Sequence, residues 1–322
     1  MNRFESVPRS PYAEKSPDER LIREVCEIRT VDVSPSDQIG YTLLNRHLIG
    51  EECPVVAVGG FLSDLTTVER AWEGIHLAEL HRPILMLDMP GHGLSSPHGF
   101  RQTYDLCVRR RVDSQARPMT EAVQKTLQPE DQIDYFGISH GALLSLKMTE
   151  QDPEDRVGNV FSIDLPAVKK RWTLGMQLGY VVIDSLIGRK RYFEEIKHNP
   201  CSRDFEAFER EFSELGVEKA DSFIKSNPGL FLCNLVASVG ARPVAIETLR
   251  RIMEEKSASV KVMTAERSSV SDYRAIGAFI GSLSPEHRQR CRQTVVEDED
   301  HNIGRCQLMP RSVAYAKEAY DS

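Results

Sequence analysis

Continuous apolar runs and helix-like segments alternate along the first half of the chain. Apolar runs cover residues 54–58, 84–87, 133–136 and 160–163, and segments with helical spacing cover 67–80, 120–127 and 141–150. A strand that is apolar throughout is typical of a sheet covered on both faces, and parallel strands need crossover helices of this kind. Residues 25–33 and, in part, 39–44 instead alternate polar and apolar positions. The pattern predicts a mostly parallel sheet that opens with an antiparallel pair at its edge.

The alternation of strands and helices stops after Pro166. Residues 167–250 have helical spacing and no convincing strand, whereas 260–264 and 294–296 restore strands and 311–320 forms a last helix. We therefore expect an α/β fold with a mostly parallel central sheet, helices on both faces and an inserted helical cap. The expected division is a polar N-terminal extension at 1–22, a core at 23–166 and 251–322, and a cap at 167–250.

Composition and charge limit the classes of function. The 322 residues are 40% hydrophobic and carry a formal net charge of -7, which offers no electrostatic attraction for nucleic acid or an anionic membrane. Short basic clusters at 109–111, 169–171 and 189–191 are interpreted as solvated faces. No stretch approaches the ~20 apolar residues of a membrane span, and the polar N-terminus lacks the apolar run of a secretory signal.

The cysteines indicate reduced thiols rather than a disulfide framework. All seven are widely spaced and form no C-x-x-C pair: Cys26, Cys53, Cys107, Cys201, Cys233, Cys291 and Cys306. This spacing predicts neither a zinc site nor a thioredoxin-like site. We expect reduced thiols and a cytoplasmic location, with no metal and no organic cofactor.

The strongest chemical signal is Gly137-Ile138-Ser139-His140-Gly141, a G-x-S-x-G pattern. On the order of 0.1 accidental matches are expected in a chain of this composition. The context adds specificity, because the motif directly follows the predicted strand 133–136 and precedes an apolar-periodic helix. Such a strand–turn–helix presents the serine hydroxyl at the carboxyl end of the sheet, where ligands bind in open α/β folds. Ser139 is therefore the candidate nucleophile.

At these residues the chain resembles the α/β-hydrolase family, of the serine-hydrolase type with a helical cap. Three more segments carry the resemblance. Asp88-Met89-Pro90-Gly91-His92-Gly93-Leu94-Ser95 resembles the family's D-x-P-G-H-G-x-S loop, Val58-Gly59-Gly60-Phe61 stands where the family has its oxyanion loop, and Asp300-His301 stands where it places the catalytic histidine. The resemblance covers residues 25–165 and 255–322 and is more specific for the fold than for a reaction.

A serine hydroxyl needs a base that removes its proton during attack. Among nine histidines, His301 has the order and position that the resemblance implies for this base. His92 is expected to be structural, and the ring of His140 is expected to point toward the helix side. The resemblance implies an oxyanion hole made of the backbone N–H groups of Phe61 and His140.

The third member of the triad is where the chain departs from the family pattern. The usual acid follows the seventh strand, but Ser268 and Ser269 stand there. Asp164, at the end of the sixth strand, is the first candidate, Glu266 is the next, and Asp272 resembles a helix N-cap. A site without an acid also stays open. Any of these carboxylates would orient the imidazole and stabilise its charged form.

These residues predict a hydrolase that cleaves an ester, thioester or similar acyl bond of a small-to-medium, hydrophobic acyl substrate through a Ser139 acyl-enzyme. The serine argues against the aspartate-based dehalogenase and epoxide-hydrolase chemistry of the family. Apolar cap residues either line the substrate pocket or form the cap's own core; they are Trp172, Met176, Leu178, Tyr180, Phe223 and Phe231. Acyl transfer, carbon–carbon bond cleavage by the same Ser–His pair and an inactive binding protein are the alternatives.

Overall fold

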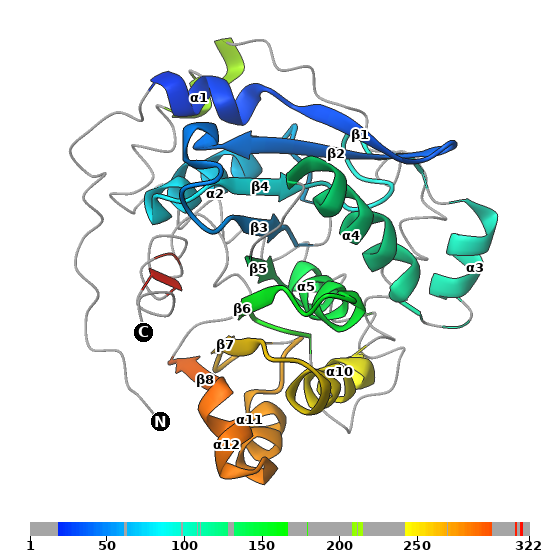
Figure 1. Cartoon of the computed structure of the whole chain (residues 1–322), viewed down its shortest axis with the longest axis vertical. Helices are drawn as coiled ribbons and strands as arrows, with labels where there is room; N and C mark the ends of the chain where they lie inside the picture. Colours follow the sequence, from blue (N-terminus) through cyan, green and yellow to red (C-terminus); the bar gives the residue numbers. More distant parts are fainter. Residues whose placement is uncertain are drawn as a thin grey trace.

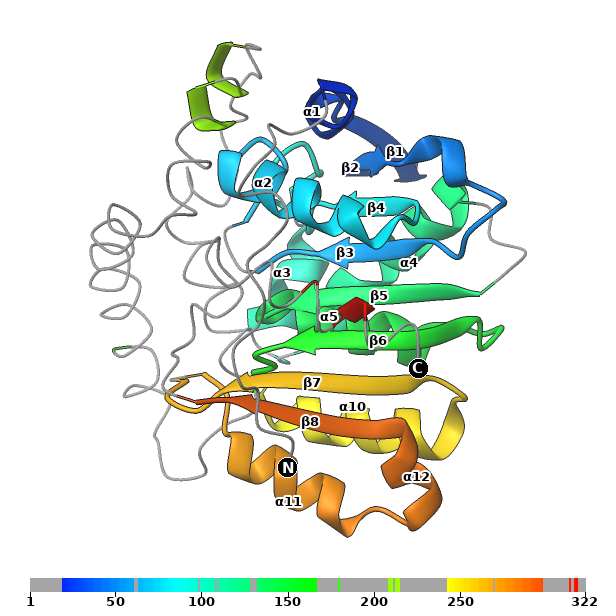
Figure 2. The same cartoon turned by 90° about the vertical axis from the view of Figure 1, so that its left-hand side faces the viewer.

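The computed structural model describes residues 19–60, 63–97, 99–107, 109, 111–127, 132–166, 179, 208–210, 212–214, 242–268, 270–297, 313 and 316–317. Eight strands form one sheet in the order β1-β2-β4-β3-β5-β6-β7-β8 (Figure 2). Their bounds are β1 Arg29–Ser34, β2 Asp37–Leu44, β3 Val55–Val58, β4 Ile84–Leu87, β5 Ile133–Ile138, β6 Val157–Ile163, β7 Ser259–Ala265 and β8 Cys291–Val296. β2 pairs antiparallel with both β1 and β4, and every other pair is parallel. The predicted mostly parallel sheet with an antiparallel opening pair is confirmed.

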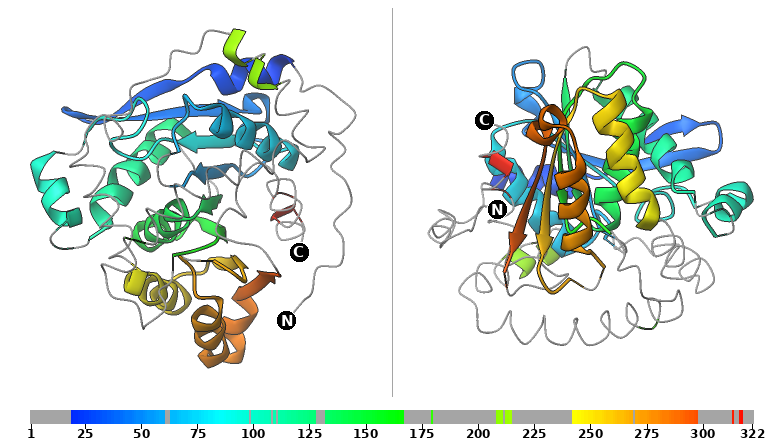
Figure 3. Two further views of the ribbon diagram at one scale, coloured as in Figure 1. Left: turned by 180° about the vertical axis from the view of Figure 1, so that it is seen from behind. Right: turned by 90° about the horizontal axis from the view of Figure 1, so that it is seen from below.

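Helices cover both faces of the sheet, as predicted. Their bounds are α1 Glu19–Cys26, α2 Val68–Leu77, α3 Phe100–Cys107, α4 Asp113–Leu127, α5 His140–Gln151, α10 Arg242–Glu255, α11 Tyr273–Ser282 and α12 Pro285–Arg290, with short 3-10 turns at η2 Arg46–Leu48 and η3 Ala78–Leu80. α2 lies on one face, and α4, α5 and α10 lie on the other (Figure 1). β1 (blue) and β8 (orange) lie at the two ends of the sheet and point in different directions in the view from below (Figure 3). This difference in direction is the twist that is usual in a β-sheet.

β3 shows why the central strands are apolar without alternation. Val56 and Val58 belong to the hydrophobic core under α4, α5 and α10, whereas Val55 and Ala57 belong to the core under α1 and α2. All four side chains are fully buried. Successive side chains point to opposite faces, so a strand between two cores needs an apolar residue at every position.

The N-terminal part of the prediction is wrong in two respects. Residues 19–22, expected in a polar extension, begin α1, and residues 25 and 26, expected in a strand, end it. Leu21, Ile22 and Val25 are buried together, a spacing that places them on one face of a helix. The alternation that predicted a strand from residue 25 applies only from Arg29, where β1 begins.

One helix differs from its predicted bounds, one was not predicted, and a third crosses the expected boundary between cap and core. α4 begins at Asp113 rather than near residue 120 and contains Pro118 in its second turn. α3 was not predicted. The expected boundary between cap and core at residue 250 falls inside α10, whose Leu249 and Ile252 are fully buried in the same core as α5. Residues 242–250 therefore pack with the core.

Most of the expected cap lies outside the described residues, and the core–cap division stays a prediction. Residues 208–210 and 212–214 are helical, and Phe208 and Phe212 are buried in the core under α1 and α2. The Phe208 ring lies 5.3 Å from the ring of Trp72 on α2. This contact joins the expected cap segment to the helix that follows β3. Of the helices in the described part of the chain, none has the length and apolarity needed to cross a membrane.

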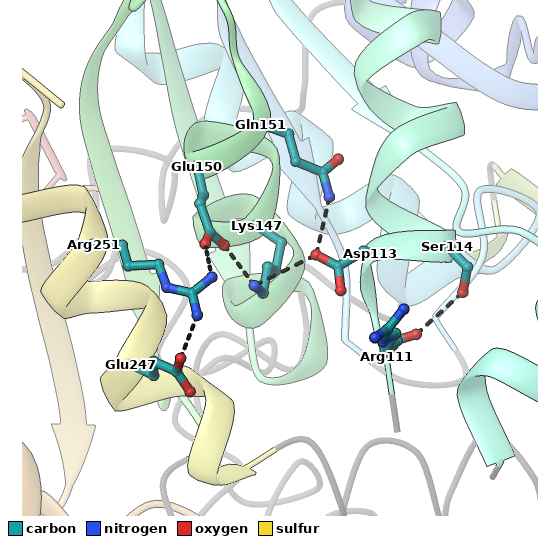
Figure 4. Close-up of polar contacts among 8 residues, drawn as sticks. All are labelled: Arg111, Asp113, Ser114, Lys147, Glu150, Gln151, Glu247 and Arg251. Atoms are coloured by element: carbon teal, nitrogen blue, oxygen red, sulfur yellow. Dashed lines mark hydrogen bonds and ion pairs between the residues drawn. The ribbon is translucent and has the colours of Figure 1, made fainter. Parts of the chain in front are cut away.

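On the face of the sheet that carries α5, ion pairs join α4, α5 and α10 (Figure 4). Lys147 of α5 lies 2.5 Å from a carboxylate oxygen of Glu150 and 3.5 Å from one of Asp113 on α4. Glu150 also accepts a hydrogen bond from Arg251 of α10, over 2.9 Å. The Lys147 side chain is only 5% exposed, so these carboxylates take the place of water as its polar partners. Arg251 and Glu247 form an ion pair at the exposed surface of α10. Because water screens the two charges there, this pair contributes little to the stability of the fold.

We predict that Glu150→Ala lowers the free energy of unfolding by about 2 kcal/mol, because it removes the nearer carboxylate from an almost buried ammonium group. Urea denaturation followed by circular dichroism measures the change. Glu247→Ala is the matched control, since it breaks an ion pair of the same chain of contacts at the exposed surface, and its midpoint should equal that of the wild type. An equal loss in both variants would contradict the buried role of Lys147.

Candidate active site

Ser139 occupies a strained turn between β5 and α5. Its backbone angles are φ 52° and ψ -117°, which a residue with a side chain rarely adopts. Its N–H donates to the carbonyl oxygen of Ile163 at 2.8 Å, and its own carbonyl accepts from Ala142 at 3.0 Å. The serine therefore stands at the carboxyl end of β5 with its backbone held by β6 and by the first turn of α5.

Two glycines make this turn possible. A Cβ atom at Gly141 would lie 2.2 Å from the Val58 carbonyl oxygen and 2.3 Å from that of Gly59. A Cβ atom at Gly137 would lie 2.6 Å from the Ala142 Cα. These neighbours are backbone atoms and cannot rotate away. Gly141 thus reflects a close approach of α5 to the end of β3, and Gly137 a close approach of β5 to the first turn of α5.

The loop after β3 lies beside the serine. A Cβ atom at Gly60 would be 3.8 Å from the Ser139 Cβ and 3.7 Å from the Ile138 carbonyl oxygen. This is the place that the sequence predicted for the oxyanion loop. Phe61, whose N–H was expected to donate there, lies outside the described residues, so its role stays a prediction.

His140 has the expected orientation. Its Nε2–H donates to Oε1 of Gln115 on α4 at 2.9 Å, and both side chains are buried. The ring is thus turned toward the helices, as predicted. The backbone N–H of His140, at the start of α5, stays the second predicted oxyanion donor. Gln115 was not singled out in the sequence, where a lone glutamine in a helix carries no signal.

Asp164 lies next to Ser139 at the same edge of the sheet. Ile138 of β5 is paired with Ile163 of β6, and Ser139 and Asp164 directly follow these two residues. The Asp164 side chain is 1% exposed, and its backbone φ is 48°. Its N–H donates to the Met263 carbonyl oxygen at 2.7 Å. A buried carboxylate thus stands one strand away from the candidate nucleophile, toward the β8 end of the sheet.

The other candidate acids have different surroundings. Glu266 is exposed at the end of β7. The Asp272 carboxylate accepts from the backbone N–H groups of Arg274 and Ala275, so Asp272 is the N-cap of α11 that its sequence resembled. His301 lies outside the described residues, as does the whole segment 298–312. Its place as the base stays a prediction.

A buried ion pair on α2 supports the loop after β3 from below. Arg70 is 1% exposed, pairs with Glu73 and donates to the Ala57 carbonyl oxygen at 2.8 Å. A Cβ atom at Gly59 would lie 3.1 Å from the guanidinium carbon. Burial raises the pKa of the Glu73 carboxyl, and the Arg70 charge opposes that rise. The sequence did not point to this pair.

Asp88 organises the Asp88–Ser95 segment that carried the resemblance. Its carboxylate accepts from the backbone N–H of Leu65 at 2.8 Å and of Leu94 at 3.2 Å. Burial raises the pKa of Asp88 to about 8, and these hydrogen bonds oppose the rise. His92 in the same segment is fully buried and donates from Nδ1 to the Pro90 carbonyl oxygen at 3.2 Å. The expectation of a structural His92 agrees with this geometry.

Comparison with known proteins identifies the fold. A sequence profile of the α/β hydrolase fold matches residues 54–179, which include the loop after β3, the Ser139 turn and Asp164. This part of the chain is similar to the α/β-hydrolase fold family. No match is found among curated protein sequences.

Solved structures share this fold over nearly the whole chain. A serine hydrolase from Cycloclasticus zankles is 14% identical, with a TM-score of 0.60, and the match covers 92% of this chain and 98% of that chain. A thermophilic esterase from Thermogutta terrifontis is 14% identical, with a TM-score of 0.57 and the same coverage. A thioesterase domain from the curacin biosynthetic pathway is 14% identical, with a TM-score of 0.56, and the match covers 92% of this chain and 99% of that chain. At these identities the likeness shows a shared α/β-hydrolase fold.

This hydrolase fold brings a hydroxyl, a buried carboxylate and a glycine loop to one edge of the sheet. Such an arrangement is suited to nucleophilic attack at a carbonyl carbon if a base joins it. Within the described part of the chain, no three His, Cys, Asp or Glu side chains come together as metal ligands would.

We predict opposite effects for the same substitution at two glycines. Gly141→Ala places a methyl group against two backbone oxygens and should lower the free energy of unfolding by about 1–3 kcal/mol or more. Gly281→Ala in α11 has open space around its Cβ and should raise it by about 0.5–1 kcal/mol, since alanine favours a helix. Thermal unfolding of both variants checks this, and a wild-type stability for Gly141→Ala would contradict the close approach of α5 to β3.

Proposed function

We propose that this chain is a serine hydrolase that cleaves an ester or thioester bond of a small-to-medium, hydrophobic acyl substrate through a Ser139 acyl-enzyme. The observation that carries the proposal is the strained backbone of Ser139 at the end of β5, beside Gly60 and one strand from a buried Asp164. Backbone strain of this kind is costly and is found where a side chain must be held for chemistry.

The proposed roles follow from elementary acid–base chemistry. His301 accepts the Ser139 proton during attack, transfers it to the leaving group, and then activates the water that hydrolyses the acyl-enzyme. Asp164 orients the imidazole and stabilises its charged form. The backbone N–H groups of Phe61 and His140 stabilise the oxyanion. No proton or electron needs to come from a metal or an organic cofactor.

The substrate class is supported by the structurally similar proteins, which include an esterase and a thioesterase domain. A reducing, cytoplasmic location is supported by Cys26 and Cys291, which are thiols in the described part of the chain.

The alternative of an inactive binding protein is favoured by the serines at the position where the family pattern has the acid. Ser268, however, donates a hydrogen bond to the Asp164 carboxylate. A carboxylate therefore lies beside the position where the family pattern expects the acid. That contact favours the active enzyme. Acyl transfer uses the same first half of the reaction, and product analysis with water and with an alcohol acceptor distinguishes the two.

We predict that a fluorophosphonate probe labels Ser139 of the folded wild type and that Ser139→Ala is neither labelled nor active, with kcat for an ester substrate about 10⁴–10⁶-fold lower. A set of p-nitrophenyl esters of increasing chain length provides the assay and defines the preferred acyl group. Ser36→Ala, in the exposed turn between β1 and β2, is the control and should keep wild-type labelling. Labelling that persists in Ser139→Ala would overturn the assignment of the nucleophile.

We also predict that Asp164→Asn lowers kcat by about 10⁴-fold, because an amide cannot stabilise the imidazolium or select the correct tautomer. Glu266→Gln is the matched comparison and should stay within a few-fold of wild type, since Glu266 is exposed. Steady-state kinetics on folded variants decides between them. A large loss in Glu266→Gln alone would reassign the acid to the end of β7.

A further inference from the structure

Ser268 lies directly against the proposed acid. It follows β7 in a tight turn, in which its N–H donates to the Ala265 carbonyl oxygen at 3.2 Å, and it is 1% exposed. Its Oγ is 2.6 Å from Oδ2 of Asp164, which follows the neighbouring strand β6. The two side chains therefore meet across the ends of two strands in a site closed to water.

The donors and acceptors around Ser268 fix the direction of this hydrogen bond. A serine hydroxyl has one hydrogen and two lone pairs. The backbone N–H groups of Val270 and Ser271 donate to its oxygen at 3.2 Å and 3.0 Å and occupy both lone pairs. The single hydrogen is thus directed to Asp164. The distance of 2.6 Å lies at the short end of the range for O–H···O hydrogen bonds.

The Asp164 carboxylate is held from β7 rather than from its own strand. Oδ2 accepts from Ser268, and Oδ1 accepts from the Ala265 backbone N–H at 3.3 Å. The Asp164 backbone in turn donates to Met263 of β7 at 2.7 Å. Both carboxylate oxygens thus receive donors from the β7 end, which limits rotation of the carboxyl group.

We propose that Ser268 is a positioning residue, which acts through Asp164 by holding the carboxylate in the orientation that the imidazole requires. The inference rests on the proposed function, in which Asp164 is the acid of the triad. It assigns a role to the serine that stands where the family pattern has the acid. Ser268 contacts neither the substrate nor the reacting atoms in this role, and its effect on the rate passes entirely through one carboxylate.

The test is a double-mutant cycle measured with the ester substrate. Ser268→Ala should lower kcat by about 10- to 100-fold with little change in KM, the effect of losing one hydrogen bond to a charged group. It should also move the acidic limb of the kcat/KM pH profile to higher pH, because a carboxylate with one donor fewer raises the pKa of the imidazole that it faces. Ser268→Thr, which keeps the hydroxyl, should recover most of the rate.

The cycle separates this role from a structural one. In the Asp164→Asn background the Ser268→Ala change should cost no further activity, because the group through which it acts is already lost. An equal loss of kcat in both backgrounds would overturn the inference. Ser271→Ala is the matched control: its buried hydroxyl has no hydrogen-bond partner within the described residues, so the rate and the pH profile should stay at wild type.

Ser268→Ala also leaves the amides of Val270 and Ser271 without their acceptor, so thermal unfolding is measured on every variant. If the alanine variant does not fold, Ser268→Cys takes its place, since a thiol fills the site as a weaker donor and acceptor, and the same non-additivity is expected. The inference fails alone if the Ser139 and Asp164 variants lose activity but the Ser268 effect is additive. An active Ser139→Ala would instead overturn the proposed function.

Discussion

The position of Ser139 depends on how closely the start of α5 approaches the end of β3. A methyl group at Gly141 would meet the carbonyl oxygens of Val58 and Gly59, so backbone touches backbone there with no side chain between them. The same contact brings Gly60 beside Ser139, whose backbone φ is positive. The proposed nucleophile and the loop proposed to form the oxyanion hole are thus brought together by main-chain packing, which varies less than the contacts of flexible side chains.

Beyond this contact, hydrogen bonds between successive strand ends hold the other residues of the candidate site. The backbone N–H of Ser139 donates to Ile163 of β6, that of Asp164 donates to Met263 of β7, and that of Glu266 donates to Val296 of β8. Each strand end is therefore fastened to the next strand. The order β5-β6-β7-β8 leads from the serine to the strand that precedes His301. Residues far apart in sequence are ordered in space by strand pairing alone.

The sequence predicted features whose cause is local and missed those whose cause is a distant contact. The apolar run of β3 and the two glycines around Ser139 each reflect a constraint that acts at their own position, and both were predicted. α1 was missed because residues from Val25 onward fit a strand as well as a helix, and only packing of Leu21 and Ile22 decides between them. The acid was left open for the same reason, since the bond between Ser268 and Asp164 joins residues on two strands. No local pattern records such a pair.

The buried pair of Arg70 and Glu73 shows a further constraint of this kind. Removing two charges from water costs about as much as their attraction returns, so a buried ion pair is a weak source of stability compared with apolar residues of the same size. Apolar contacts, however, have no preferred direction. The Arg70 guanidinium donates to the Ala57 carbonyl oxygen and lies against Gly59. It therefore holds the direction in which the chain leaves β3. The loop proposed to present an N–H group beside Ser139 is thus held by directional hydrogen bonds where it leaves β3, whereas packing alone would not fix its orientation.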